Sequence, residues 1–310
     1  MKFKKAKILV IGDVMIDRYI YGNVERISPE APVPVLHKND ESSFLGGAGL
    51  VVSNLKSLGA DVDFIAVVGK DKEYLDMKRL LSEKKIPEDG LICEEGRHTT
   101  IKTRFVAASP HFQMLLRLDN ETKDDIRPET ERKIIDQVKR GMSRAAFVIV
   151  SDYNKGVLTT KVIDAILMEA KKSRKKVIVD TKKSLHGYKG SYLVAPNTTE
   201  LCLAFGLKNT NEDDVVLPNA IRLSKELGCV VVVKRSGKGA TIADSHGIRT
   251  YPSLAGNVIN VSGAGDIFVS ILTMALASDQ PLNEAVKMAN LGCGKAIAKK
   301  HPSITPEDLR

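Results

Sequence analysis

The chain has 310 residues, of which 43% are hydrophobic and 27% charged, which is enough to bury a large core without disulfides or metal ions. Its longest apolar runs have only the length of a strand and no low-complexity stretch occurs, which excludes membrane-spanning, fibrous and disordered proteins. The formal net charge of +9 indicates anionic partners, and with 5% aromatic residues and no tryptophan we expect small anions, not nucleic acid or a membrane.

Strand-like and helix-like segments alternate along most of the chain. In chain order we expect a strand at 7–11, a helix at 47–58, a strand at 63–68, helices at 72–84 and 128–143, a strand at 146–151, a helix at 160–172, strands at 175–179 and 192–194, a helix at 217–227, a strand at 230–234, and helices at 264–277 and 282–299. Strands that alternate with helices are typical of a parallel sheet covered on both faces. We therefore predict one α/β domain over residues 1–310, with a mainly parallel central sheet.

Two stretches interrupt this alternation, at about residues 18–38 and 98–118. The first contains Pro29, Pro32 and Pro34, and the second alternates like a hairpin that turns near Ser109-Pro110. Because proline is confined to the edges of sheets, we expect both stretches to be edge strands of a small sheet that projects from the domain. This sheet is either a lid over a site or a hairpin without a functional role.

Cysteine and histidine usage indicates the cellular compartment. The four cysteines, Cys93, Cys202, Cys229 and Cys293, lie far apart, and the six histidines form no ligand pair, so neither a disulfide framework nor a transition-metal site is expected. The basic N-terminal residues 1–7 lead into a short apolar run without a cleavage site, which is unlike a signal peptide. We predict a cytoplasmic protein.

A glycine-rich motif precedes the helix expected at 264–277. Neither a P-loop nor a GxGxxG sequence occurs, but residues 260–266 read Asn-Val-Ser-Gly-Ala-Gly-Asp. The glycines let the backbone approach a ligand, and successive N–H groups at a helix start bind anions. Asp266 is then either a helix cap or the acceptor of a proton in phosphoryl transfer to a hydroxyl.

These residues and several others resemble the ribokinase family of sugar kinases, of the phosphofructokinase B type. The resemblance covers nearly the whole chain, and its motifs occur in the family's order: Gly12-Asp13 with Asp17, Gly46-Gly47-Ala48, Asn197-Thr198-Thr199-Glu200, Lys234-Arg235-Ser236-Gly237-Lys238-Gly239, Gly263-Ala264-Gly265-Asp266 and Ala289-Asn290. It implies a ribokinase-like three-layer α/β/α fold with a small β lid, and a kinase that uses ATP and Mg²⁺.

Within this family, residues 26–35 and 151–156 are similar to D-glycero-β-D-manno-heptose 7-phosphate kinases. That resemblance implies ATP-dependent phosphorylation of the anomeric hydroxyl to the 1,7-bisphosphate, a step toward the ADP-heptose of the lipopolysaccharide core. In many bacteria this kinase is fused to an adenylyltransferase. Since the chain ends at Arg310, we expect no adenylyltransferase domain here and a separate protein for that step.

The resemblance assigns roles around the acceptor sugar. Asp266 would be the catalytic base, beside an anion hole formed by Gly263, Ala264 and Gly265. The substrate-binding residues would be Asp13, Asp17, Gly46, Gly47, Lys102, Arg104, Arg117, Asp152 and Lys155. At two-residue spacing Lys102 and Arg104 share one face of a strand, where they bind the substrate phosphate or, alternatively, are solvated charges that protect a sheet edge. Asp17 is alternatively a surface aspartate.

The resemblance also assigns the nucleotide and metal sites. The nucleotide would contact Asn197, Lys234, Ser236, Gly237, Gly239 and Asn290. Asn197 and Glu200 would hold Mg²⁺ largely through water, as this strongly hydrated ion prefers. The alternatives are that Asn197 and Glu200 form a helix cap and that Asn290 is a buried structural residue.

Three positions depart from the family's pattern. Leu50 and its neighbours follow the glycine pair where the family has an asparagine that contacts the sugar, and Thr181 stands where heptose kinases have proline. Asn260 replaces the aspartate that opens the glycine motif. A neutral amide attracts a monovalent cation less, so we expect at most weak activation by K⁺, unless Asn260 only hydrogen-bonds its loop.

Two other functions stay open from the sequence. One is a kinase of the same family that acts on another sugar or sugar phosphate. The other is a catalytically silent protein that binds a nucleotide or sugar, which the intact Asp266 and Glu200 disfavour. In each case an exposed edge of the lid sheet predicts a homodimer.

Overall fold

A nine-stranded sheet forms the centre of the protein. The computed structural model describes residues 3–107 and 113–309. The strands of the central sheet are β1 (Lys7–Gly12), β4 (Asp61–Gly69), β5 (Leu91–Glu94), β8 (Phe147–Asp152), β9 (Lys176–Thr181), β10 (Leu193–Val194), β11 (Val230–Lys234), β12 (Ala240–Asp244) and β13 (Gly247–Tyr251). Their order is β13-β12-β11-β10-β9-β8-β1-β4-β5, and only the β11–β12 and β12–β13 pairs are antiparallel. The prediction of a mainly parallel sheet is confirmed.

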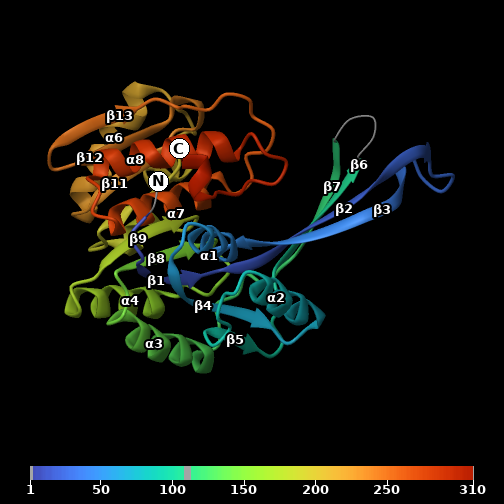
Figure 1. Ribbon diagram of the computed structural model, residues 1–310, viewed down its shortest axis with the longest axis horizontal. Helices are drawn as coiled ribbons and strands as arrows, with labels where there is room; N and C mark the ends of the chain where they lie inside the picture. The colour runs from blue at the N-terminus through green and yellow to red at the C-terminus, as the bar shows by residue number, and fades with distance from the viewer. Residues whose placement is uncertain (1–2, 108–112, 310) are drawn as a thin grey trace.

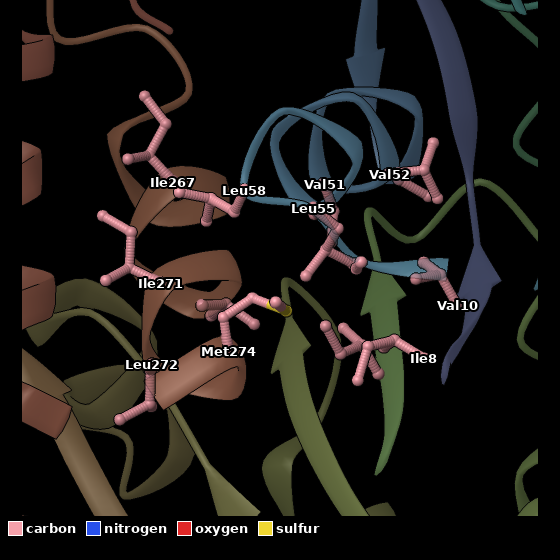
Figure 2. Close-up of a cluster of buried hydrophobic side chains, with 14 of the residues drawn as sticks. Ile8, Val10, Val51, Val52, Leu55, Leu58, Ile267, Ile271, Leu272 and Met274 are labelled. Atoms are coloured by element: carbon pink, nitrogen blue, oxygen red, sulfur yellow. The ribbon is translucent and has the colours of Figure 1, made fainter. Parts of the chain in front are cut away.

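Helices cover both faces of this sheet. One face carries α1 (Ala48–Ser57), α2 (Lys72–Glu83), α7 (Ala264–Ala277) and α8 (Leu282–Ala296), and the other carries α3 (Pro128–Met142), α4 (Thr160–Lys172), α5 (Thr198–Ala204) and α6 (Asp213–Leu227). Successive side chains of a strand point to opposite faces, so Ile8 and Val10 of β1 pack toward α1 and α7 (Figure 2), while Leu9 and Ile11 pack on the other side. The three layers therefore follow from the continuous apolar runs of the parallel strands.

Short 3-10 turns at Leu185–Tyr188, Ser236–Lys238 and Pro306–Leu309 complete the body. Among residues 3–107 and 113–309, no helix combines the length and the apolarity needed to cross a bilayer.

A second sheet of four strands forms the lid. Its strands are β2 (Val14–Ile27), β3 (Pro34–Gly47), β6 (Ile101–Ala107) and β7 (Gln113–Asn120), in the order β3-β2-β6-β7. The sheet extends away from the body as a narrow arm (Figure 1), which confirms the predicted projecting sheet. The prediction that both stretches are edge strands is wrong, because β2 and β6 pair with each other in parallel and only β3 and β7 are edges.

The prolines explain part of this arrangement. Pro34 is the first residue of the edge strand β3, and Pro29 and Pro32 lie in the connection before it, where no ladder N–H is needed. The turn expected near Ser109-Pro110 lies outside the described residues. Proline therefore marks the outer strand and the turn of the first hairpin but says nothing about its inner strand.

Most predicted elements are found within a few residues of their expected bounds, and the differences have local causes. Helix α6 begins at Asp213 instead of 217, because Asp213 and Asp214 favour the positive end of the helix dipole and Pro218 is accommodated inside the helix. Helix α8 ends at Ala296 instead of 299. The strands β5, β12 and β13 and the helix α5 were not predicted, since each is short and lacks a long apolar run.

Candidate active site

A cavity of about 530 Å³ lies where the lid meets the body. This volume is typical of small-molecule sites. Its wall contains seven of the residues proposed from the sequence, namely Asp17, Gly47, Lys102, Arg104, Arg117, Gly263 and Asp266. The projecting sheet is therefore one wall of a cavity whose opposite wall includes the start of α7.

The N-terminus of α7 presents Asp266 to this cavity. Gly263 is the N-cap and has φ 76, and a Cβ atom there would lie 2.2 Å from the Leu50 side chain, so this position requires glycine. Because Gly263 occupies the cap position, the interpretation of Asp266 as the helix cap is wrong. The Asp266 side chain is instead directed at the Tyr153 hydroxyl, which donates to both carboxylate oxygens at 2.8 Å.

The surroundings of Asp266 bring the pKa of its carboxyl close to physiological pH. Burial, together with the nearby Asp180 carboxylate, raises the pKa of Asp266 to about 7. The Tyr153 hydroxyl and the ammonium groups of Lys234 and Lys182 act in the opposite direction. A carboxylate with a pKa near the working pH is suited to accept a proton from a hydroxyl.

Two lid cations, Lys102 and Arg104, project into the cavity from β6. Their side chains are only 14% and 12% exposed, and β6 is an inner strand, so the interpretation as solvated edge charges is wrong. Arg104 Nη1 lies 2.5 Å from Asp17 Oδ1, and Lys102 Nζ lies 2.8 Å from Asp119 Oδ2 and 3.3 Å from Glu121 Oε2. Carboxylates thus hold both cations in place, and Asp17 is a partner of Arg104 in the cavity, not a surface aspartate.

Four of the proposed substrate-binding residues lie outside the cavity wall: Asp13, Gly46, Asp152 and Lys155. The Asp13 carboxylate accepts hydrogen bonds from backbone N–H groups of the loop after β8. The Asp152 carboxylate accepts hydrogen bonds from Thr181 Oγ1 at 2.9 Å and from Tyr188 Oη at 2.6 Å. Lys155 Nζ pairs with Glu121 at 2.7 Å, and Gly46 lies against the Asp17 carboxylate. The protein itself engages the Asp13 and Asp152 carboxylates, which does not support direct sugar binding by either.

The proposed nucleotide-binding segment begins beside the start of α7. Lys234 Nζ lies 2.8 Å from Asp180 Oδ1 and 3.2 Å from the position of a Cβ on Gly265. The ammonium group therefore stands next to the helix N-terminus, where an anion would bind. Ser236 and Gly237 follow in the turn Ser236–Lys238, with open space around Gly237, and Gly239 packs on the backbone of the β13 end.

Asn197 and Glu200 form the capping box of α5. Asn197 Oδ1 accepts the Glu200 N–H at 2.8 Å, and Glu200 Oε2 accepts the Asn197 N–H at 2.7 Å. Lys182 Nζ donates to Glu200 Oε1. The helix-cap interpretation is confirmed, and in the part of the chain that the structure describes no group of three or more His, Cys, Asp or Glu could hold a metal ion. Since both Glu200 oxygens already accept hydrogen bonds, an ion here would be bound through water.

Two asparagines have structural contacts. Asn290 is 8% exposed, and its Nδ2 donates to the carbonyls of the last residue of β13 and of the residue after it, at 3.2 Å and 3.4 Å, as the buried structural interpretation predicts. Asn260 Oδ1 accepts the Ser262 N–H, and its Nδ2 donates to the Lys300 carbonyl, both at 2.9 Å. Asn260 therefore holds the loop before α7 through both ends of its amide.

Sequence reasoning missed several residues of the cavity region. Tyr153 lies in the wall and contacts Asp266, although its only signal was a place in the segment 151–156 at the end of a buried strand. Asp180 lies at the end of β9 and raises the pKa of Asp266. His301 also lines the cavity, with Nε2 3.2 Å from the Tyr21 hydroxyl, and no local pattern marks it.

The protein has a ribokinase-like fold. Phosphofructokinase-2 from Escherichia coli in complex with potassium matches with a TM-score of 0.80 and 20% identity, over 98% of this chain and 97% of that chain. Ribokinase from Arabidopsis thaliana, complexed with ribose and ATP, matches with a TM-score of 0.73 and 14% identity, over 99% of this chain and 98% of that chain. At such identities the likeness concerns the fold alone.

The chain belongs to the pfkB family of carbohydrate kinases, whose family model matches residues 5–309. It is 41% identical over 312 residues to the bifunctional protein HldE of Aliarcobacter butzleri, covering 99% of this chain and 64% of the relative. It is 40% identical over 310 residues to the bifunctional protein HldE of Paramagnetospirillum magneticum, covering 99% of this chain and 63% of the relative. The chain thus spans somewhat less than two thirds of the length of these relatives.

Proposed function

We propose that this chain uses ATP to phosphorylate the anomeric hydroxyl of D-glycero-β-D-manno-heptose 7-phosphate. The observation that carries the proposal is a single cavity whose wall contains Asp266 together with the lid cations Lys102, Arg104 and Arg117. A sugar phosphate must present its hydroxyl to a base and its phosphate to cations at the same time. Membership of a carbohydrate kinase family and the heptose-kinase-like segments at 26–35 and 151–156 support the same reaction.

The chemistry of this reaction follows from residues around the start of α7. The anomeric oxygen forms a bond to the γ-phosphorus while the bond from phosphorus to the bridging oxygen of ADP breaks, and the hydroxyl proton passes to Asp266. The N–H groups of residues 263–265 stabilise the charge that develops on the transferred group. The Lys234 ammonium beside this helix end adds to the same field.

The residues also fit the nucleotide and its ion. Lys234, Ser236, Gly237 and Gly239 would line ATP, and Asn197 and Glu200 would hold Mg²⁺ through water. The open space at Gly237 and the hydrogen-bonded Glu200 carboxylate agree with these roles. When bound, ATP supplies the phosphoryl group and Mg²⁺ neutralises its charge. Asn260 is neutral, and both ends of its amide already form hydrogen bonds to the backbone. K⁺ is therefore proposed to be at most a weak activator.

A panel of acceptors tests the proposal, with ADP release as the measurement. We expect kcat/KM for heptose 7-phosphate to exceed that for unphosphorylated heptose by about 100-fold or more, since the phosphate adds charge-assisted contacts to the lid cations. Other sugars and sugar phosphates in the panel show whether a different family substrate is preferred. Equal kcat/KM for the phosphorylated and unphosphorylated heptose would contradict the assignment, and no turnover with any acceptor despite ATP binding would favour a silent binding protein.

The lid is also the proposed contact with a second copy of the chain. On the edge strand β7, Leu116 and Leu118 are 59% and 57% exposed and lie on the side opposite Arg117, and Met114, beyond a β-bulge, is 55% exposed. An apolar stripe beside the unpaired edge of a sheet is a surface that a partner covers. We propose that it is the lid of a second copy, which gives a homodimer.

Replacing Leu116 by aspartate should convert this dimer into monomers, because a desolvated carboxylate opposes burial of the stripe. Light scattering after size-exclusion chromatography measures the mass. Met168→Asp, at a 61% exposed position on α4 in the body, is the matched control and should leave the mass at two chains. A wild-type protein that is monomeric at micromolar concentration, or a Leu116→Asp variant that remains dimeric, would contradict the proposal.

The cytoplasm is the proposed compartment. All four cysteines are unpaired thiols, and burial raises the pKa of Cys293 to about 12, so this thiol stays protonated and unreactive. Unpaired thiols and a need for ATP both suit a reducing, nucleotide-rich environment.

A further inference from the structure

The loop after β8 is fixed by the buried carboxylate of Asp13. Asp13 is 2% exposed, and its Oδ2 accepts the N–H groups of Tyr153 at 2.7 Å and Lys155 at 3.1 Å, while Oδ1 accepts that of Val157 at 3.3 Å. Burial and the neighbouring Asp152 raise the pKa of Asp13 to about 6, so it is mainly ionised at neutral pH. Three hydrogen bonds to one carboxylate give this loop, and the Tyr153 backbone in particular, a defined position.

From this position the Tyr153 side chain reaches the cavity wall and contacts Asp266. Its hydroxyl lies 2.8 Å from Oδ1 and 2.8 Å from Oδ2, so one donor bridges both oxygens of the carboxylate. Burial raises the pKa of Tyr153 well above its usual range, and the Asp266 charge adds to this effect. The hydroxyl is therefore a permanent donor at any pH at which the enzyme works.

The other groups around Asp266 are charged and come from different strands. Asp180 at the end of β9 raises the pKa of Asp266, and Lys182 after β9 and Lys234 at the end of β11 lower it. Within the described residues, Lys234 forms its ion pair with Asp180, and Lys182 forms its ion pair with Glu200, so neither ammonium group pairs directly with Asp266. Tyr153 makes the direct hydrogen bonds to the carboxylate.

We propose that Tyr153 is a positioning residue for the base, in that its hydroxyl, held by the Asp13-anchored loop, fixes the orientation of the Asp266 carboxylate and favours its charged form. The inference rests on the proposed role of Asp266 as the proton acceptor, and it adds the residue that orients this carboxylate and stabilises its charged form. A carboxylate has about four lone-pair sites, so two contacts to Tyr153 leave room for the acceptor hydroxyl. Tyr153 itself exchanges no proton with the substrate.

The first test measures Asp266 directly and needs no substrate. Tyr153→Phe removes only the hydroxyl oxygen, and the carboxyl resonance of Asp266 is followed by ¹³C NMR as the pH is changed, with Asp266→Asn used to assign it. We expect the pKa of Asp266 to rise by about one pH unit in Tyr153→Phe, because a hydrogen bond that favours the charged form is lost. An unchanged pKa of Asp266 would overturn the inference, whichever sugar the enzyme uses.

The second test is the pH dependence of kcat/KM with the best acceptor from the panel. The base must be ionised to accept a proton, so activity is lost as the pH falls through the pKa of Asp266. In Tyr153→Phe we expect this loss to begin at higher pH, giving about tenfold lower kcat/KM below pH 7 and recovery toward the wild-type value above about pH 9. A uniform loss at every pH would indicate a merely structural role and overturn the inference.

Tyr188→Phe is the matched control. The Tyr188 hydroxyl also donates to a buried carboxylate, Asp152, at 2.6 Å, but that pair lies away from the cavity wall. Loss of the Tyr188 hydroxyl should lower the melting temperature of the protein. It should not move the acid limb of the pH profile, that is, the pH range over which kcat/KM falls. If Tyr188→Phe shifts the limb as much as Tyr153→Phe does, the effect is not specific to the Asp266 contact and the inference fails.

A double mutant gives an independent kinetic test. When Tyr153 acts only through Asp266, adding Tyr153→Phe to Asp266→Asn should cause no further loss of kcat. A further tenfold loss in the double mutant would overturn the inference. Failure of heptose 7-phosphate as an acceptor would instead reject the proposed function while the NMR result stands.

Discussion

Replacing Asp266 by asparagine should lower kcat by about 100-fold or more while the affinity for ATP changes little. The amide keeps the shape of the side chain and can still accept a hydrogen bond from Tyr153, but it cannot take the proton of the acceptor hydroxyl. Steady-state ADP release gives kcat, and equilibrium binding of a non-hydrolysable ATP analogue gives the affinity. Wild-type turnover in this variant would remove Asp266 from the mechanism.

The same variant should lose the acid limb of the pH profile. Burial raises the pKa of Asp266 to about 7, so wild-type kcat/KM should fall as the pH drops below that value, where the base becomes protonated. Asp164→Asn removes an exposed carboxylate on α4 and controls for the change in net charge. It should keep both the rate and the acid limb.

Removing a lid cation should narrow the preference for the phosphorylated sugar. We expect Lys102→Ala or Arg104→Ala to lower kcat/KM for heptose 7-phosphate by about tenfold or more, because a charge-assisted contact to the substrate phosphate is lost. The value for unphosphorylated heptose should change much less. The ratio of the two values is the measurement, since it cancels general effects on folding and on ATP binding.

Lys38→Ala is the matched control for the lid cations. Lys38 lies on the same sheet, on β3, but its side chain is 55% exposed and pairs with Glu41 outside the cavity wall. The preference ratio should stay at the wild-type value. If Lys102→Ala and Arg104→Ala also leave the ratio unchanged, the phosphate does not bind at these cations.

Most of the element pattern, and the helix α7 that carries Asp266, could be predicted from the sequence alone. Helix α7 was expected at 264–277 and is found at Ala264–Ala277, because a glycine motif directly before a long apolar run indicates a helix start locally. The buried strand β1 and the projecting lid were likewise marked by local signals, an apolar run and a group of prolines. Such signals lie within a few residues of one another, so no knowledge of distant contacts is required.

The charge pairing within the cavity was decided only by the tertiary structure. Arg104 and Asp17 are 87 residues apart and Tyr153 and Asp266 are 113 apart, and neither pair follows from any local pattern. Sequence reasoning also treated Asp13 as a sugar ligand, whereas its carboxylate holds the loop that carries Tyr153. Which donors reach a buried carboxylate depends on how the strand ends meet at the edge of the sheet, and this is set by long-range packing. The sequence could therefore name Asp266, while only the fold could show which groups contact its carboxylate and raise its pKa.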